Sequence, residues 1–244
     1  MRTGSPVLGG ICVVLGAGGT LGSAVTEAFT QAGAQVVGAD LQESPGIIEC
    51  DVTDEASVAA VFAYAAHRGE ICHVVHAAGL AAVSAVSEAD LADVRRLLEV
   101  NLVSCFVTAK QAVGRLTAGH SLTFIASHAA LYGSARWAAY SASKAGVVSL
   151  TQALAQETGR LGPRVNCVSP GSVESPMMDV VLARAATERQ LPVEQIRMEA
   201  ELASPLARFA TPQEVAGVCV FLASPAAGYI TGANIVINGG ERPG

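Results

Sequence analysis

The chain has 244 residues and a net charge of −6, and its fifteen basic residues are scattered rather than clustered, which argues against a nucleic-acid partner. With 51% hydrophobic and only 15% charged residues, it is more apolar than an average soluble domain, which suggests burial between subunits. No apolar run approaches the ~18 residues of a membrane span, so we expect a cytoplasmic protein with no membrane partner.

Short apolar runs alternate with longer helical stretches along the chain. We expect strands at residues 11–15, 35–39, 71–76, 121–126, 164–168 and 234–237, and helices near 20–32, 54–68, 91–116, 138–160 and 211–223. This alternation is typical of a parallel sheet with helices on both faces. The sequence therefore predicts an α/β fold, a Rossmann-type doubly wound sheet in one domain over residues 1–244.

Residues 175–205 depart from this alternation. Met177 and Met178 begin an apolar stretch, and the charged run EQIRMEAELAS follows it. We interpret the segment as a helical insertion over the sheet. Simple packing and a cover for the substrate are equally good explanations, because ligands bind among loops and insertions at the strand ends.

The first apolar segment and the cysteines both point to an intracellular protein. Arg2 followed by VLGGICVVLGAGG imitates a secretory leader, but its glycines and the lack of a cleavage site favour a strand and a turn. Six dispersed cysteines without a CxxC indicate small buried side chains in a reducing compartment: Cys12, Cys50, Cys72, Cys105, Cys167 and Cys219.

His73 and His76 lie in an apolar strand without acidic or cysteine companions, so we expect no metal.

A glycine-rich turn, GAGGTLG at residues 16–22, follows the first predicted strand and leads into a helix. Gly16, Gly19 and Gly22 allow a tight turn, close approach of a pyrophosphate and packing of the helix on the sheet. The phosphate would rest on the helix N-terminus. No lysine follows Gly22, so this is not a Walker A loop. An ordinary turn is the alternative, but the order of strand, turn and helix favours a dinucleotide.

Asp40 closes the second predicted strand, at about the ~20-residue spacing of an acid that binds the adenosine ribose. A carboxylate there repels a 2′-phosphate, and neither the glycine turn nor the following LQES offers a cation to neutralise one. The sequence therefore favours NAD over NADP. If Asp40 only ends a strand, no cofactor preference follows.

The stretch YSASK, residues 140–144, lies in an alanine-rich helix. Tyr140 and Lys144 are four residues apart and therefore share a face, where the ammonium can act on the phenol. Such pairs are also common on solvated faces. An unperturbed phenol titrates near pH ~10, so a proton shuttle at neutral pH needs a nearby cation, and this pair supplies one.

Together these motifs resemble the short-chain dehydrogenase/reductase family over essentially the whole chain. GAGGTLG stands where that family has TGxxxGxG, HAAG at 76–79 resembles NNAG, and SPGSVESP resembles the PGxVxT stretch. EVNLVSCF supplies Asn101 and IAS supplies Ser127. Four departures from the family pattern affect side-chain contacts rather than the backbone of the turn: Leu15, Thr20, His76 and Ala77. A fifth, Ser175, stands where threonine is typical, and its hydroxyl could make the same contact with the nicotinamide carboxamide.

The resemblance implies catalytic roles for four residues. Tyr140 would exchange a proton with the substrate, and Ser127 would bind the substrate oxygen. Lys144 would hold the nicotinamide ribose and lower the free energy needed to ionise the phenol. Asn101 would anchor a water-linked proton path. The alternatives are a strand-end hydroxyl for Ser127 and a helix-kinking polar residue for Asn101. The implied cofactor contacts are Gly16, Gly19, Thr20, Leu21, Gly22, Asp40, Leu41, Asp51, Val52, Ala78, Gly79, Asn101, Tyr140, Lys144, Pro170, Gly171, Val173 and Ser175.

Four further residues are candidates for substrate contact: His128, Arg136, Trp137 and Met177. Arg136 could pair with a substrate carboxylate or phosphate, although a subunit contact is the favoured alternative. The tail TGANIVINGGERPG resembles the last strand of the family, which implies a homotetramer or a dimer.

The favoured function is NAD-dependent interconversion of a secondary alcohol and a ketone, on a small or cyclic substrate such as a hydroxy acid or a dihydrodiol. The first alternative is a 3-oxoacyl-thioester (acyl-carrier-protein) reductase using NADPH, against which Asp40 and the net acidity argue. The second is a non-catalytic dinucleotide-sensing protein. Retention of both Tyr140 and Lys144 argues against it, since the fold alone does not.

Overall fold

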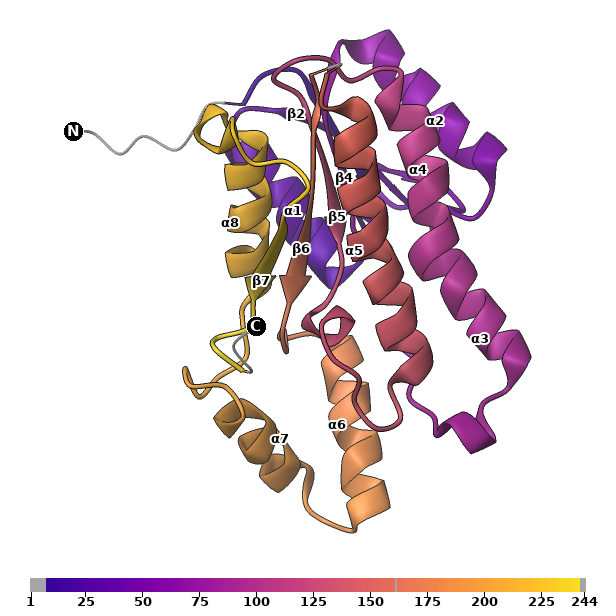
Figure 1. Ribbon diagram of the computed structural model, residues 1–244, viewed down its shortest axis with the longest axis vertical. Helices are drawn as coiled ribbons and strands as arrows, with labels where there is room; N and C mark the ends of the chain where they lie inside the picture. The colour runs from indigo at the N-terminus through magenta and orange to yellow at the C-terminus, as the bar shows by residue number, and fades with distance from the viewer. Residues whose placement is uncertain (1–7, 161, 242–244) are drawn as a thin grey trace, which may run out of the picture.

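The protein is built on one seven-stranded sheet, described by a computed structural model over residues 8–160 and 162–241. All strand pairs are parallel, in the order β3-β2-β1-β4-β5-β6-β7. The strands are β1 (Ile11–Leu15), β2 (Gln35–Asp40), β3 (Ile47–Glu49), β4 (Ile71–His76), β5 (Ser121–Ile125), β6 (Arg164–Pro170) and β7 (Asn234–Ile237). Helices cover both faces (Figure 1), which confirms the predicted doubly wound α/β fold.

The helices follow the predicted order, with short turns of other helix types between them. The α-helices are α1 (Thr20–Gln31), α2 (Glu55–Arg68), α3 (Leu91–Leu98), α4 (Ser104–Val113), α5 (Ala138–Thr158), α6 (Pro176–Arg189), α7 (Val193–Leu202) and α8 (Pro212–Ala223). The 3-10 turns are η1 (Val86–Glu88), η3 (His128–Ala130) and η4 (Pro225–Ala227), and η2 (Glu99–Val103) is a π-helix.

Two apolar cores lie on opposite faces of the sheet. Cys12 and Val14 of β1 belong to the core beneath α1 and α8, which includes Phe29. Leu15, from the same strand, belongs to the opposite core beneath α2, α4 and α5, together with Phe124. This alternation is the period of two expected of a strand, and burial on both faces explains why β1 is uniformly apolar.

The observed elements differ from the predicted ones, or add to them, at three points. The single helix predicted over 91–116 is divided into α3, η2 and α4, and it ends at Val113. The insertion at 175–205 is two helices, because Gln190 has a φ of 53° and Pro192 follows it. The three-residue strand β3 is too short to leave a periodic pattern. The other predicted elements begin and end within two residues of the observed ones.

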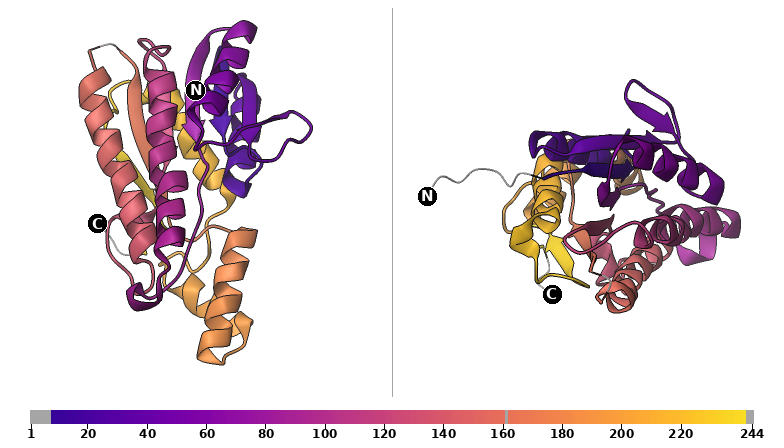
Figure 2. Two further views of the ribbon diagram at one scale, coloured as in Figure 1. Left: turned by 90° about the vertical axis from the view of Figure 1, so that its right-hand side faces the viewer. Right: turned by 90° about the horizontal axis from the view of Figure 1, so that it is seen from above.

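α6 and α7 project beyond the carboxyl end of the sheet (Figure 1; Figure 2, left). They have a small apolar core of their own, made by Leu182, Ala186, Ile196 and Phe209. This placement puts the two helices at the edge where parallel α/β sheets bind ligands.

The cysteines match the expected small buried residues. Five of the six are buried, Cys72 is partly exposed, and all six are free thiols. Burial raises the pKa of Cys105 and Cys219 to about 12 and that of Cys167 to about 11, so these thiols are poor nucleophiles. Among the described helices, none is both long enough and apolar enough to span a bilayer.

Candidate active site

The strand order reverses between β1 and β4, at the carboxyl edge of the sheet. β1 connects to β2 and β3 on one side, whereas the chain returns through α2 to β4 on the other side of β1. Ligands of open α/β sheets bind at such a switch point. The amide of Ala77, just after β4, donates to Leu15 O at 2.8 Å, so the segments that leave the two strands stay together.

The glycine turn lies at this point and is tightly packed. Gly16 has a φ of 84°, and a Cβ there would lie 2.5 Å from Ala78 N. A Cβ on Gly22 would overlap Gly16 O. Gly19 is the N-cap of α1 and brings no side chain to the helix end, which leaves the first-turn amides open to an anion. These features fit the pyrophosphate of a dinucleotide.

Asp40, the last residue of β2, is held at the glycine turn. Its Oδ2 accepts from the Gly18 amide at 2.8 Å and its Oδ1 accepts from the Leu41 amide at 2.7 Å. Each carboxylate oxygen can accept a second bond, so both keep capacity for ribose hydroxyls. The Leu41 side chain is 60% exposed beside it. The structure thus places the predicted ribose-binding acid next to the predicted phosphate turn.

The other predicted contacts for adenine and nicotinamide lie along the same edge. Asp51 accepts from the Thr53 amide and hydroxyl, and these bonds lower its pKa. Val52 beside it is buried. Pro170 ends β6, and the Gly171 amide donates to Ile237 O at 2.8 Å.

Tyr140 and Lys144 occupy one face of α5, one turn apart, as the spacing predicts. Lys144 is only 5% exposed, its Nζ donates to Ile125 O at 2.9 Å, and it lies 6.0 Å from the centre of the Tyr140 ring. That bond uses one of the three donors of the ammonium and leaves two for a ligand. The Trp137 ring packs edge-on against Tyr140 at 5.4 Å. A buried cation is therefore fixed beside the phenol by the end of β5.

Ser127 follows β5 and is buried, with 7% exposure. Its Oγ accepts from the Ala129 amide at 3.2 Å and so caps the 3-10 turn η3. The hydroxyl proton is left to donate elsewhere, which is the capacity needed to bind a substrate oxygen.

Asn101 lies in the π-helix η2 and is fully buried. Its Oδ1 accepts from the Leu80 amide at 2.7 Å, and its Nδ2 donates to Leu80 O at 2.9 Å and to Ser143 Oγ at 3.1 Å. The side chain therefore joins the segment after β4 to α5. A Cβ on the neighbouring Gly79 would lie 3.2 Å from Lys144 Nζ, so glycine permits this close approach.

His76, at the end of β4, forms a buried network that the sequence did not indicate. Its Nδ1 lies 2.9 Å from Thr108 Oγ1 and its Nε2 lies 3.1 Å from Ser104 Oγ. Ser104 donates to Val100 O at 2.6 Å, so Nε2 carries the ring proton and Thr108 donates to Nδ1. Burial, assisted by the positive charge of Lys144, lowers the pKa of His76 to about 3. A neutral imidazole thus connects β4 to α4, and through Ser104 to Val100 of the π-helix.

Both histidines of β4 have polar partners inside the protein. His73 Nδ1 contacts Ser121 Oγ at 3.0 Å, and burial lowers its pKa to about 4. Three potential ligands do gather elsewhere among the described residues: Glu70, Cys72 and His120. The Thr117 amide donates to His120 Nδ1 at 3.1 Å, and Nε2 of the same ring lies 3.7 Å from Glu70 Oε1.

The candidate substrate residues have different surroundings. Arg136 has a φ of 70°, and its Nη2 lies 3.1 Å from Glu188 Oε1 and 3.9 Å from Glu88 Oε2, so it is paired within the chain. His128 Nδ1 lies 2.8 Å from Tyr132 Oη and 3.6 Å from Glu241 Oε2. Neither Glu188 nor Glu241 could be found as a partner from sequence, because both lie more than fifty residues away along the chain.

Ser175 and its neighbours anchor the projecting helices. Ser175 Oγ accepts from the Met178 amide at 3.2 Å as the N-cap of α6, and it donates to Val173 O at 3.2 Å. Its hydroxyl is therefore engaged by the backbone, although it could accept one further bond.

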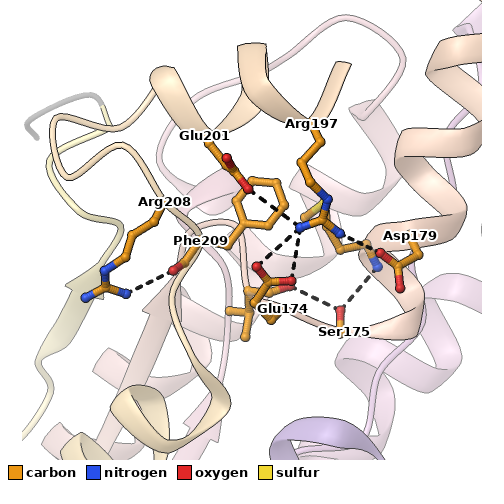
Figure 3. Close-up of polar contacts among 9 residues, drawn as sticks. Glu174, Ser175, Asp179, Arg197, Glu201, Arg208 and Phe209 are labelled. Atoms are coloured by element: carbon orange, nitrogen blue, oxygen red, sulfur yellow. Dashed lines mark hydrogen bonds and ion pairs between the residues drawn. The ribbon is translucent and has the colours of Figure 1, made fainter. Parts of the chain in front are cut away.

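Arg197 of α7 joins this region through several ion pairs (Figure 3). It lies 3.1 Å from Glu174, 2.8 Å from Asp179 and 3.7 Å from Glu201, and its Cζ lies 5.2 Å from the centre of the Phe209 ring. One guanidinium thus connects the segment after β6 to both projecting helices. No motif in the sequence pointed to it.

A cavity of about 520 Å³ opens beside these elements. Its wall includes Ala81 after β4, Leu97 of α3, Ala139 of α5 and Met177 of α6. Met177, a predicted substrate contact, is 47% exposed there. The cavity therefore begins one residue from Tyr140 along the chain and extends toward α6.

The fold and the site define a Rossmann-type oxidoreductase that binds a nicotinamide dinucleotide. A family model described as enoyl-(acyl carrier protein) reductase matches residues 16–241. The chain belongs to the short-chain dehydrogenase/reductase family and is a short-chain alcohol dehydrogenase.

Three similar proteins act on cyclic or sugar alcohols, according to their names. L-fucose dehydrogenase of Oryctolagus cuniculus is 34% identical over 100% of this chain and 89% of that protein. Trans-4-hydroxycyclohexanecarboxylate dehydrogenase of Sinomonas cyclohexanicum is 34% identical over 96% of this chain and 93% of that protein. The structure of sorbitol-6-phosphate 2-dehydrogenase of Erwinia amylovora has a TM-score of 0.90 and 30% identity, covering 96% of this chain and all of that one.

Proposed function

We propose that the protein oxidises a secondary alcohol on a small or cyclic substrate, with NAD as the hydride acceptor, and catalyses the reverse reduction of the ketone. The observation that carries the proposal is the buried Lys144 ammonium, held by Ile125 O and 6.0 Å from the Tyr140 ring at the carboxyl edge of the sheet. The ammonium keeps two donors for a ligand beside the phenol, because Ile125 O uses only one of its three.

The side chains divide the work between the proton and the substrate oxygen. Tyr140 takes the hydroxyl proton of the alcohol or returns it to the ketone. Ser127 donates to the substrate oxygen and stabilises the negative charge that develops on it. Asn101 acts through Leu80 and Ser143, because its amide is engaged by both. A water-linked proton path at this position would therefore run through the backbone of Asn101 or through neighbouring residues.

The glycine turn and Asp40 would hold the dinucleotide. The tight backbone at Gly16 and Gly22 and the open end of α1 suit the pyrophosphate. Asp40 suits the unphosphorylated ribose of NAD, since its carboxylate is fixed close to the turn. Bound NAD supplies the hydride acceptor, which no side chain of the chain can replace. In this proposal α6 and α7 cover the substrate.

Two alternatives are less well supported. A 3-oxoacyl-thioester reductase using NADPH would have to accept a 2′-phosphate near Asp40. A dinucleotide sensor without turnover would have no use for a buried ammonium beside a phenol, because burying that charge has an energetic cost. We also infer a cytoplasmic location from the six free cysteines.

Replacement of Tyr140 tests the proposed function. Tyr140→Phe should lower kcat by roughly 10²–10⁴-fold, the usual contribution of a general acid–base group. Binding of NAD, measured by fluorescence titration, should change little. The assay follows nicotinamide absorbance with L-fucose and a panel of cyclic secondary alcohols. Tyr64→Phe, at an exposed tyrosine of α2, is the matched control. Full activity of Tyr140→Phe would show that the proposed mechanism is wrong.

A further inference from the structure

The cavity beside α6 is positioned to hold the part of the substrate away from the reacting carbon. Ala81 follows Leu80, whose backbone is fixed by Asn101, and Ala139 precedes Tyr140. Its volume, about 520 Å³, lies within the usual range for small-molecule sites. The inner wall is apolar and includes Val83, Val94 and Val181, which suits the face of a ring.

The charged residues that line the cavity are predominantly acidic. They are three carboxylates, Glu88, Asp90 and Asp93, and one guanidinium, Arg184. These four side chains sum to a net charge of −2. Asp90 accepts from the Ala92 amide at 2.8 Å as the N-cap of α3.

The cations beside the cavity are already paired. Arg184 Nε lies 2.9 Å from Glu188 Oε1, and Arg136 Nη2 lies 3.1 Å from the same oxygen. Arg136 is also 3.9 Å from Glu88. The positive charges of the two arginines balance the negative charges of these two glutamates. The negative charges of Asp90 and Asp93 are therefore not balanced within this group.

We propose that this cavity selects uncharged cyclic alcohols, such as sugars and polyols, over substrates that carry a carboxylate or a phosphate. An anionic group would meet the acidic surplus and would have to displace Glu188 to reach either arginine. The hydroxyls of a neutral ring can donate to the carboxylates instead. The inference rests on the proposed dehydrogenase function and narrows its substrate class.

The test compares two rings that differ in charge, 4-hydroxycyclohexanecarboxamide and 4-hydroxycyclohexanecarboxylate, with NAD as cofactor. For the unmodified enzyme, kcat/KM should be at least about tenfold higher for the amide, and added salt should narrow the gap because the acidic groups are exposed. Glu188→Gln removes the carboxylate that both arginines share and should raise kcat/KM for the acid by roughly fivefold or more, with the amide nearly unchanged. Glu157→Gln, an equal charge change at an exposed site of α5, should alter neither.

Two outcomes would overturn the proposal: the unmodified enzyme uses the acid as well as the amide, or Glu188→Gln leaves their ratio unchanged. If neither ring is oxidised, the proposed reaction fails for these compounds, and binding of the same pair is compared by saturation-transfer NMR. Tighter binding of the amide then supports the charge selection. Equal or tighter binding of the acid contradicts it.

Discussion

Asp40 shows how one side chain can set a cofactor preference through position and charge. Two backbone amides, those of Gly18 and Leu41, hold its carboxylate at the glycine turn. A 2′-phosphate would add about two negative charges close to it. At about 5 Å and an effective dielectric constant between about 40 and 80, Coulomb's law gives a repulsion of roughly 2–3 kcal/mol.

Asp40→Asn should therefore weaken the preference for NAD, by roughly 10- to 100-fold in the ratio of kcat/KM for NAD to that for NADP. Asp40 accepts the two amide bonds through different oxygens, so the single side-chain oxygen of asparagine can keep one of them. Steady-state kinetics with both cofactors measure the effect. Glu43→Gln, three residues along the chain at an exposed position, removes the same charge and should leave the ratio unchanged. An unaltered ratio in Asp40→Asn would refute the charge argument.

His76 illustrates a residue that works through its neighbours. Both ring nitrogens are engaged, and the ring connects the end of β4 with Ser104 and Thr108 beside the π-helix. The folded protein keeps it neutral, with a pKa of about 3, and His73 likewise has a pKa of about 4. In the unfolded chain both histidines titrate near ~6.5.

These two histidines predict how stability depends on pH. Below about pH 6.5 these histidines bind protons in the unfolded chain but not in the folded protein. The free energy of unfolding should therefore fall as pH decreases from about 6.5 toward 4. Each histidine contributes a slope of up to about 1.4 kcal/mol per pH unit. His76→Asn should remove one of the two contributions between about pH 5 and 6, as measured by urea unfolding at several pH values. The slope of unfolding free energy against pH should be smaller in the variant than in the unmodified protein. An identical slope in the variant would contradict a buried neutral His76.

At the scale of elements, α6 and α7 are attached to the sheet by few side chains. Their small core contains Leu182, Ala186, Ile196 and Phe209, and Arg197 provides the main polar connection to Glu174 and Asp179 (Figure 3). Units with little buried apolar surface open locally at a lower free energy than the global core. This pair of helices is therefore the part of the described structure best suited to admit substrate.

Arg197→Ala should loosen this pair of helices without unfolding the sheet. Exposed ion pairs contribute at most about 1 kcal/mol, so the thermal unfolding temperature should change little. Amide hydrogen exchange over residues 176–202 should become faster, and KM for the alcohol should rise several-fold while NAD binding is retained. Arg68→Ala, which removes an arginine stacked on Tyr64 of α2, is the matched control. Unchanged exchange over 176–202 would mean that Arg197 does not fasten the helices.

The elements differ in how far sequence could predict them. β1 was predictable because burial on both faces makes ICVVL uniformly apolar, and the four-residue spacing of Tyr140 and Lys144 correctly placed both on one face. The π-helix was not, because it interrupts a run with continuous helical character. The pairing of Arg136 with Glu188 was also beyond local pattern, since 52 residues separate them.

At the scale of the whole molecule, the described sheet ends on one side at the short apolar strand β7. β7 pairs only with β6 among the described strands, and its sequence NIVI has neither a charge nor a proline. Monomeric proteins usually guard such an edge with lysine, proline or a bulge. Val236 of this strand is 39% exposed, and Phe221 of α8 and Tyr229 are 40% and 104% exposed.

These features, together with the apolar composition, lead us to expect a homo-oligomer, a tetramer or a dimer, that associates through the face formed by β7 and α8. Light scattering during size-exclusion chromatography at micromolar concentration should give a multiple of the monomer mass. Val236→Lys puts a charge on the edge strand and should reduce that mass by about half or to the monomer, because a charged edge disfavours pairing between chains. Val86→Lys, at an exposed valine of η1, should leave the mass unchanged. A monomeric unmodified protein, or an unchanged oligomer in Val236→Lys, would exclude this face as the site of association.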